Sequence, residues 1–576
     1  AVSNSILGNG TTLLGSQVVP GGFNVVWNVS DMGTHSSFTA LQDAGAGWSN
    51  SLYADPLFCN ATNGDFHVRS SAGRWDTNLA AFVATDTNDS PAIDFGDPAA
   101  AVAAEPPPNG SRLNVGLFGG TEQASKSRTN AWIQLASYLN GGTLDAQAGA
   151  WMRWNAGEYE PGATVTIWLS RDNGASWEAL ATNAPAADGH YYYQDPIADD
   201  SSSREALLRV ELNDAVPPAS SQSPTNFIYR NGTFAFYVND DSQSGDVYCS
   251  ALGSDANSGS SAGAPMRNLH ALLNKLGQLG PGDRIYVDTG VYAATNAVRI
   301  TAPFSGSATN PVVIAGSTNR LAGGSLFQSS GAQPRPLGFD VQPGVSNLVL
   351  RDLAVVYVAR GVAATNVVNV TLDGVEVRGA TSRAFDLQFT SRSNRLVRCV
   401  AHGGAIGLYL NQASNVVVSH SIFWENTVNA AYLGAVAGLN LENSVLASTA
   451  TNAALVSLAA TNLFVSDYNG IHAGPFTRVG ENRTTGAKAD DLAAWQRLTG
   501  GQDVHSIPGD PQLADPTTYD YHLKTKETLG RRLPNGQRTT DSVSSPLLDA
   551  GNPATPLGEE PEPNGSRVNI GKYGGT

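Results

Sequence analysis

The sequence predicts an all-β protein in which a β-sandwich separates the C-terminal coils of a first β-helix from a complete right-handed parallel β-helix. Three observations lead to this fold class. Only 15% of the 576 residues are charged, and Gly, Ala, Ser, Thr and Asn are abundant, as in long β-structures with many turns. A strand-like pattern recurs every 21–25 residues in the second half of the chain. A closing motif occurs twice, at residues 105–121 and 560–576.

The overall composition excludes several classes of partner. The formal net charge is −16 and no basic stripe occurs, so we expect no nucleic acid as a partner. No stretch of 18 or more apolar residues occurs, so we expect no membrane span in this segment. The opening "AVSNSILGNG" reads like the middle of a fold and not like a signal peptide, which indicates a processed or partial piece of a longer chain.

The three cysteines, Cys59, Cys249 and Cys399, match no zinc or redox spacing. We expect free thiols that pack as small hydrophobic residues, with a bridge between Cys249 and Cys399 as the open alternative. No metal site and no cofactor is predicted from these residues.

Six alternating stretches carry the repeat. They begin at Asn347, Asn369, Asn394, Asn415, Gly438 and Asn462, in steps of 22, 25, 21, 23 and 24 residues. Each alternates apolar and polar residues between Asn, Gly or Ser, which is the pattern of a β-strand and not of a helix. A rung of this length holds about three short strands and predicts one coil of a parallel β-helix, whose repeats contact only their neighbours.

Aligning the six stretches on their first residues predicts which side chains face inward. The inward columns are Leu348, Val370, Arg395, Val416, Leu439 and Leu463, and Leu350, Leu372, Val397, Val418, Leu441 and Val465. The next column is polar and is expected to form a surface ladder of paired charges: Arg351, Asp373, Arg398, Ser419, Glu442 and Ser466. The leading Asn residues are expected at tight bends, because Asn tolerates left-handed backbone, and their amides can stack.

The start of the complete β-helix is also visible in the sequence. Residues 266–279 carry Leu269, Leu272, Leu273 and Leu276 at helical spacing before "GPGD", and the strand "RIYVDTGVY" follows. We expect a short amphipathic helix that covers the open first coil. Together with "GSDANSG", this opening resembles the first coil of secreted right-handed β-helix proteins of the pectate-lyase-like superfamily, and the resemblance covers roughly residues 246–576.

The two closing motifs read "EPPPNGSRLNVGLFGGT" and "EPEPNGSRVNIGKYGGT", with twelve of seventeen positions identical. They are preceded by matching "DP" and "SPAIDFGDP" or "SPLLDAGNP" segments, and by short helical stretches that start near Ser37 and Leu492. This region resembles the terminal region of large bacterial surface β-helix proteins of the choice-of-anchor Q type. The copies lie 455 residues apart, the separation of Thr121 and Thr576. We therefore assign residues 1–121 to the end of a first β-helix and 239–576 to a complete one.

Residues 122–238 show short alternating strands every 8–12 residues, which predicts a β-sandwich. "SRDNGASW" predicts a hairpin turn, and "NFIYRNGTFAFYV" is expected to contain the last strand. The stretch resembles the Ig-like or fibronectin-III-like modules of bacterial surface proteins. Its tryptophans, Trp151, Trp154, Trp168 and Trp177, are expected mainly in the core or in packing between domains, with a sugar-stacking platform as the alternative.

The superfamily that the β-helix resembles contains polysaccharide lyases, polygalacturonases and epimerases, so the fold does not decide the function. Lyases of this kind use a Lys or Arg base beside calcium, and hydrolases use clustered Asp residues. In this chain, His402 falls in an apolar column with Val355, Val377, Phe423 and Leu446 and is expected in the core or at a coil edge. No three acidic residues share a column. Under the enzymatic alternative, the candidate catalytic residues are Arg398, His402 and His420.

The duplicated module and the lack of a catalytic constellation favour a structural function. We expect a repeat unit of a large secreted bacterial protein that forms an extracellular fibre, sheath or cell-surface stalk, with copies of itself and glycans as partners. One alternative is a polysaccharide lyase or glycoside hydrolase, and another is a glycan-binding adhesin without turnover.

Overall fold

The computed structural model describes residues 2–8, 20–29, 37–43, 48, 50–102, 104–198, 201–294, 296–329, 335–460, 462–533, 535–562 and 564–575. The chain divides into two compact units, Ala1–Gly232 and Thr233–Thr576. Helices are few and short throughout the described residues, and none of them has the length and apolar character needed to cross a membrane.

The second unit is a parallel β-helix with three sheets, each of which has nine strands in the described part of the chain. The first sheet contains β19 (Ala235–Val238), β20 (Arg284–Val287), β23 (Val312–Gly316), β26 (Ser346–Arg351), β29 (Val368–Asp373), β32 (Arg395–Val397), β35 (Ser414–Ser419), β38 (Ala437–Glu442) and β41 (Leu463–Asp467). The second contains β21 (Gly290–Ala294), β24 (Ser325–Ser329), β27 (Leu353–Val356), β30 (Glu376–Arg378), β33 (Val400–His402), β36 (Ile422–Trp424), β39 (Val445–Ser448), β42 (Gly470–Ala473) and β45 (Ile507–Pro508). The third contains β22 (Val298–Ile300), β25 (Arg335–Val341), β28 (Val358–Thr365), β31 (Arg383–Gln388), β34 (Ile406–Asn411), β37 (Asn429–Gly434), β40 (Ala454–Leu458), β43 (Arg478–Asn482) and β44 (Ala487–Ala489).

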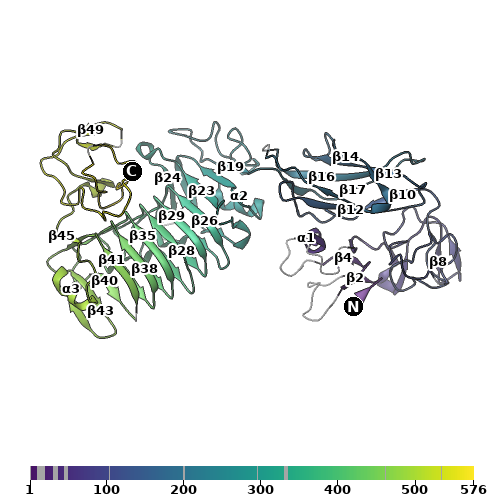
Figure 1. Ribbon diagram of the computed structural model, residues 1–576, viewed down its shortest axis with the longest axis horizontal. Helices are drawn as coiled ribbons and strands as arrows, with labels where there is room; N and C mark the ends of the chain where they lie inside the picture. The colour runs from purple at the N-terminus through teal and green to yellow at the C-terminus, as the bar shows by residue number, and fades with distance from the viewer. Residues whose placement is uncertain are drawn as a thin grey trace. The chain divides into compact units, whose positions relative to one another are not determined.

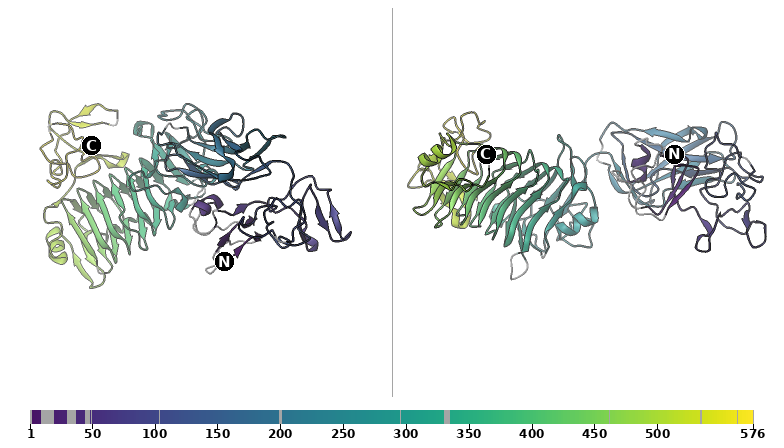
Figure 2. Two further views of the ribbon diagram at one scale, coloured as in Figure 1. Left: turned by 45° about the vertical axis from the view of Figure 1, so that its right-hand side comes forward. Right: turned by 90° about the horizontal axis from the view of Figure 1, so that it is seen from below.

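Figure 1 shows these strands stacked between helix α2 (Leu269–Leu276) at one end and helix α3 (Leu492–Thr499) at the other, and Figure 2 shows the same stack from two further sides. The predicted capping helix is therefore present. Its N-terminus is capped by Asn268, whose side chain accepts from the backbone amides of His270 and Ala271. Its four leucines, Leu269, Leu272, Leu273 and Leu276, are buried against the first coils.

Left-handed backbone marks the corners of the coils, as expected for the leading Asn residues. Asn347, Asn369 and Asn415 have φ of 52°, 54° and 50°, and the Asn369 side chain donates to Asn347 Oδ1 at 2.7 Å. A second column of such corners separates the first and second sheets: Asp352, Gly374, Arg398, His420, Asn443 and Tyr468. Corner residues are thus repeated from coil to coil.

Two of the six aligned stretches are shifted by one residue from the predicted register. Strand pairing places Ser393, not Asn394, beside Asn369, so Leu396 faces inward and Arg395 and Val397 do not. A register shift between Ala437 and Asn440 displaces the last stretch as well. A shift of one residue exchanges the two faces of a strand, and the predicted core residues Leu463 and Val465 are consequently 71% and 59% exposed.

The first unit contains a β-sandwich whose two sheets share one apolar core. One sheet contains β10 (Trp132–Leu135), β12 (Ala150–Gly157) and β15 (His190–Tyr193). The other contains β11 (Thr143–Asp145), β18 (Phe227–Arg230), β16 (Ser203–Leu212), β13 (Thr164–Ser170), β14 (Glu178–Pro185) and β17 (Ala219–Gln222). The predicted hairpin joins β13 to β14. The expected last strand is divided, because Phe227–Arg230 stays in the sandwich while Ala235–Val238 opens the β-helix.

The N-terminal part of the first unit has the elements of a β-helix end. They are β1 (Val2–Ser3), β2 (Ile6–Gly8), β3 (Pro20–Gly22), β4 (Val25–Trp27), α1 (Phe38–Asp43), β5 (Leu52–Tyr53), β6 (Phe58–Asn60), η1 (Ala61–Asn63), β7 (Asp65–Val68), β8 (Arg74–Asp76) and β9 (Ala81–Val83). The parallel order β2–β4–β5 corresponds to β39–β42–β45 at the end of the second unit. This correspondence includes the predicted alignment of Asn4 with Asn443.

We call residues 55–121 the first closing segment and residues 510–575 the second. The second contains β46 (Leu513–Asp515), η5 (Pro516–Thr518), β47 (Asp520–Leu523), β48 (Arg531–Arg532) and β49 (Arg538–Thr539), and the remaining short helices of the chain are η2 (Ala186–Asp188), η3 (Ala302–Phe304) and η4 (Arg320–Ala322). It packs over the second sheet through Leu513, Tyr521, Leu547 and Ile570.

Both closing segments make the same hydrogen bonds. A glutamate carboxylate accepts two backbone amide hydrogens from the last turn of its own segment. The donors are Asn114 and Gly120 for Glu105, at 2.9 and 2.7 Å, and Asn569 and Gly575 for Glu560, at 2.8 and 2.7 Å. An asparagine of the last coils accepts from the segment: Asn4 from the Asp97 amide at 2.8 Å and Asn443 from the Asn552 amide at 2.7 Å. The segment therefore closes both β-helix ends in one way.

All three cysteines are free, which rules out the bridge between Cys249 and Cys399. Cys399 is buried inside the coils, and burial raises the pKa of its thiol to about 12.

Candidate functional site

The second closing segment covers a cluster of buried charges on the second sheet. Glu376 on β30 is 3% exposed, and Lys572 from the closing segment, also 3% exposed, donates to its Oε1. Arg320 donates to the same oxygen, and Arg378 donates to Oε2 at 2.6 Å. One carboxylate is therefore shared by three cations contributed by different coils and by the closing segment.

The cations determine the ionisation of this cluster. Burial raises the pKa of Glu376, but the attraction of Lys572 and the two arginines outweighs burial and holds this pKa well below its usual range. Burial lowers the pKa of Lys572 to about 8, against the opposing attraction of Glu376. At neutral pH the cluster is a closed ion-pair network, which fastens the closing segment to the coils and leaves no free acid or base.

The candidate His402 lies on the outer face of the second sheet, not in the apolar column. Pairing places Ala401 beside Val377 and His402 beside Arg378, because the Asn394 stretch is shifted by one residue. The imidazole is covered by the closing segment, with Nδ1 2.8 Å from the hydroxyl of Tyr521. Burial, then the charge of Arg378, lowers the pKa of His402 below its usual range.

The candidates Arg398 and His420 occupy successive corners between the first and second sheets, with φ of 56° and 51°. Arg398 donates to Asp373 Oδ1 through Nε at 2.9 Å and through Nη2 at 2.5 Å, and Arg351 donates to Asp373 Oδ2 at 3.1 Å. The predicted charge ladder of these three residues is therefore present, although Arg398 enters it from a corner. It leaves Arg398 paired and not free to act as a base.

His420 is 8% exposed and packs against Gly574 of the closing segment. Its Nε2 has no hydrogen-bond partner among the described residues. Burial, then the charge of Arg398, lowers the pKa of His420 to about 4, so the ring is neutral at physiological pH. Each of the three candidates is thus engaged in packing or pairing, and none faces open solvent beside a second reactive group.

A polar and aromatic row on the outer face of the third sheet was not predicted. Asp386 is 1% exposed and accepts from Arg360 at 3.2 Å, from Arg383 at 3.1 Å and from Gln388 at 2.7 Å. The Arg383 guanidinium lies 3.5 Å from the ring centre of Tyr409, which stacks on Tyr432 of the next coil at 4.7 Å. The sequence does contain a signal for this row, since Arg360 and Arg383 occupy the same position in successive coils. That signal appears only when the strands of the third sheet are aligned with one another.

Within the described residues, no group of three or more His, Cys, Asp or Glu side chains could hold a metal ion.

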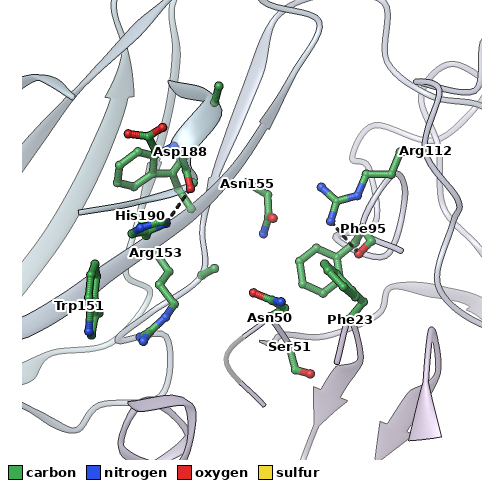
Figure 3. Close-up of a pocket in the computed structure, with 14 residues that line it drawn as sticks. Phe23, Asn50, Ser51, Phe95, Arg112, Trp151, Arg153, Asn155, Asp188 and His190 are labelled. Atoms are coloured by element: carbon green, nitrogen blue, oxygen red, sulfur yellow. Dashed lines mark hydrogen bonds between the residues drawn. The ribbon is translucent and has the colours of Figure 1, made fainter. Parts of the chain in front are cut away.

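The first unit contains a cleft of about 390 Å³ between the β-sandwich and the first β-helix end (Figure 3). Alternate residues of β12, Trp151, Arg153 and Asn155, form one wall together with His190 of β15. The opposite wall carries Phe23, Asn50, Ser51, Phe95 and Arg112. The two walls are tied together, since Gln42 of α1 donates to the carbonyl of Ala136 at 3.0 Å and Thr39 accepts from the Tyr138 amide at 2.8 Å.

The four tryptophans singled out in the sandwich differ in exposure. Trp154 is 2% exposed and donates to the carbonyl of Ala186 at 3.1 Å, which confirms core packing. Trp168 and Trp177 share the Arg209 guanidinium, which lies 5.5 and 4.4 Å from their ring centres. Trp151 is 38% exposed and lines the cleft. Of these four tryptophans, Trp151 is thus the one that exposes its ring to the cleft.

No protein-family model matches the chain, and no curated protein matches its sequence. Two solved structures are similar: a pectate lyase, with 15% identity, a TM-score of 0.28 and coverage of 59% of this chain and 97% of that one, and a rhamnogalacturonan lyase, with 11% identity, a TM-score of 0.29 and coverage of 54% and 96%.

Proposed function

We propose that this chain is a structural segment of a secreted bacterial protein, in which β-helices joined by sandwiches build an extracellular fibre, sheath or stalk. The observation that carries the proposal is the duplicated end. The same closing segment, with the same glutamate, asparagine and backbone partners, ends a β-helix twice within one chain. The resemblance of this segment to choice-of-anchor Q regions, and of the sandwich to Ig-like modules, fits a surface location.

The engagement of the candidate catalytic residues supports the same proposal. Arg398 is held by Asp373, His402 lies under Tyr521, and His420 is buried beside Gly574. A β-helix whose polar side chains pair with one another between coils is suited to stiffness, since each rung is fixed to its neighbours.

Electron microscopy of the purified chain at high concentration tests this proposal. Regular end-to-end or lateral particles are the expected result, because a repeated contact between identical units generates an extended assembly. Isolated monomers at every concentration, in the absence of any higher-order particle, count against a fibre or sheath.

A second function is favoured by one observation, the row on the third sheet. The arginines around Asp386 and the stacked Tyr409 and Tyr432 combine positive charge with aromatic faces, which suits recognition or cleavage of an acidic polysaccharide. In a lyase, the arginines of this row would bind the uronate carboxylate of the substrate.

The test is product analysis after incubation with uronic-acid polymers, with and without calcium. Turnover that is lost in Arg383→Gln but retained in Arg299→Gln would establish this second function. Arg299 is the matched control, since it pairs with Asp340 on the same sheet and its side chain is 61% exposed. No product from any polymer would exclude it.

A further inference from the structure

The cleft of the first unit has the size and lining of a ligand site. Its volume of about 390 Å³ lies within the usual range of small-molecule pockets, roughly 300–1,000 Å³. The hydrogen bonds from Gln42 to the Ala136 carbonyl and from the Tyr138 amide to Thr39 hold its two walls together, and Arg153 adds an ion pair to Asp43 of α1 at 2.6 Å. The cleft is therefore preformed, so little conformational freedom is lost when a ligand binds.

An exposed aromatic platform stands at one side of the cleft. Trp151 lies directly opposite Tyr192 across β12 and β15, with ring centres 5.0 Å apart, and His190 meets its edge at 5.1 Å. These contacts fix the orientation of the indole while leaving it 38% exposed. A large, rigid and partly exposed aromatic side chain is a typical contact surface for a ligand with an apolar face and polar edges.

Polar groups of fixed direction line the rest of the cleft. His190 Nδ1 donates to the carbonyl of Asp188 at 2.7 Å, which leaves Nε2 as the ring nitrogen that can meet a ligand. The Asn155 amide points into the cleft and makes no hydrogen bond to a described side chain or backbone group (Figure 3). A ligand rich in hydroxyl groups can satisfy both, since a hydroxyl donates and accepts.

Arg112 supplies a positive charge that attracts Asp94 and Asp97 without a direct ion pair among the described residues. Its guanidinium donates through Nε to the carbonyl of Gly96 at 2.6 Å and through Nη2 to the carbonyl of Phe95 at 3.3 Å. Among the described residues it forms no ion pair with a carboxylate, and Figure 3 shows it directed toward Asn155 across the cleft. A half-buried arginine that is oriented and lacks a direct carboxylate partner is suited to a carboxylate on a ligand.

We propose that this cleft binds an acidic saccharide, with the pyranose ring against Trp151 and the sugar carboxylate on Arg112. The hydroxyl groups of the sugar form hydrogen bonds with the Asn155 side-chain amide and with His190 Nε2. A purely apolar ligand is disfavoured because it would leave these polar groups without partners. The proposal is independent of the structural function, since the site lies in the sandwich and in the first β-helix end and uses no group of the charged cluster or of the third sheet.

Titration calorimetry of the full chain with a glucuronate-containing disaccharide tests the proposal, and the methyl ester of the same sugar removes the ligand charge without altering the protein. We expect the free acid to bind saturably and the ester to bind about tenfold more weakly. Trp151→Ala should weaken binding of the acid by about tenfold. Trp177→Ala is the matched control and should bind as the unmodified chain does, because Trp177 lies outside the cleft against Arg209.

Four results would overturn the proposal. These are no saturable binding of the free acid, equal binding of acid and ester, an equal loss in Trp151→Ala and Trp177→Ala, and displacement of the sugar by inorganic phosphate at the same concentration. The last result would assign the cleft to small anions in general. Asn155→Ala, which removes a side chain without a described partner, should weaken binding about threefold without altering the fold.

Discussion

Replacing Glu376 by glutamine removes the carboxylate that Lys572, Arg320 and Arg378 share. Lys572 then stays buried beside two partly exposed arginines, and among the described residues only Arg320 keeps a second carboxylate partner, Asp352. Breaking a buried ion pair by removing one partner costs about 3–5 kcal/mol. Replacing Lys572 by methionine removes one of three cations and leaves Glu376 with two, so the expected cost is smaller, about 1–3 kcal/mol. Glu376→Gln is expected to cost more than Lys572→Met because Glu376 has three charged partners in the cluster and Lys572 has one.

The measurement is hydrogen exchange of backbone amides in the second closing segment, because a chain with two compact units is not expected to unfold in one cooperative transition. The informative amides are those of Gly571, which donates to the carbonyl of Asn443 at 2.8 Å, and of Gly575, which donates to Glu560 at 2.7 Å. Glu376→Gln should reduce their protection more than Lys572→Met does, and the Gly120 amide of the first closing segment should be unchanged in both.

A matched control and a double variant sharpen this test. Leu117 occupies the position of Lys572 in the first closing segment and is 70% exposed, so Leu117→Ala should alter no protection. The double variant should lose less protection than the sum of the single variants, because the two residues are in contact. An equal loss of amide protection in the two single variants, or no loss in Glu376→Gln, would refute the reasoning from shared partners.

Three further predictions concern pH and the corners of the coils. Between pH 6.5 and about 4 the unfolded chain binds a proton that folded His420 does not, so stability falls as the pH falls. His420→Asn keeps a residue that tolerates positive φ and should reduce this loss in acid unfolding. Between about pH 8 and 10.5 the unfolded chain holds more protons than folded Lys572 does, so stability rises with pH. Lys572→Met should lack this rise when alkaline unfolding is compared. At the corner with φ of 50°, Asn415→Val should cost about 1–3 kcal/mol and Asn415→Gly much less, as measured by thermal unfolding.

The β-helix could be predicted from the sequence because its signals are repeated. The steps of 21–25 residues, the alternation within each strand and the two copies of the closing motif all indicate the same fold. The register was lost at Asn394 because asparagine serves two functions in this chain. At Asn369 it forms a left-handed corner, while Asn394 is buried and its Oδ1 accepts from the Val370 amide at 2.9 Å. Residue type alone does not distinguish these positions.

The sites could be predicted only in part. The alignment brought Arg351, Asp373 and Arg398 together, and the structure places them in one ladder. The charged cluster was not visible, because Lys572 reaches Glu376 from 196 residues away along the chain. The cleft was not visible for the same reason, because Arg112 of the first β-helix end and Asn155 of the sandwich lie far apart in the sequence and line opposite walls. Contacts of this kind follow from tertiary packing, which local patterns do not encode.

We propose that the chain serves as an extracellular structural segment. Immunogold electron microscopy of the cells that make the protein, with antibodies raised against residues 239–576, tests this claim most directly. We expect label along extracellular fibres, a sheath or stalks at the cell surface, at regular intervals where the β-helix recurs. Label confined to the cell interior, or dispersed in the medium without any assembly, would contradict it.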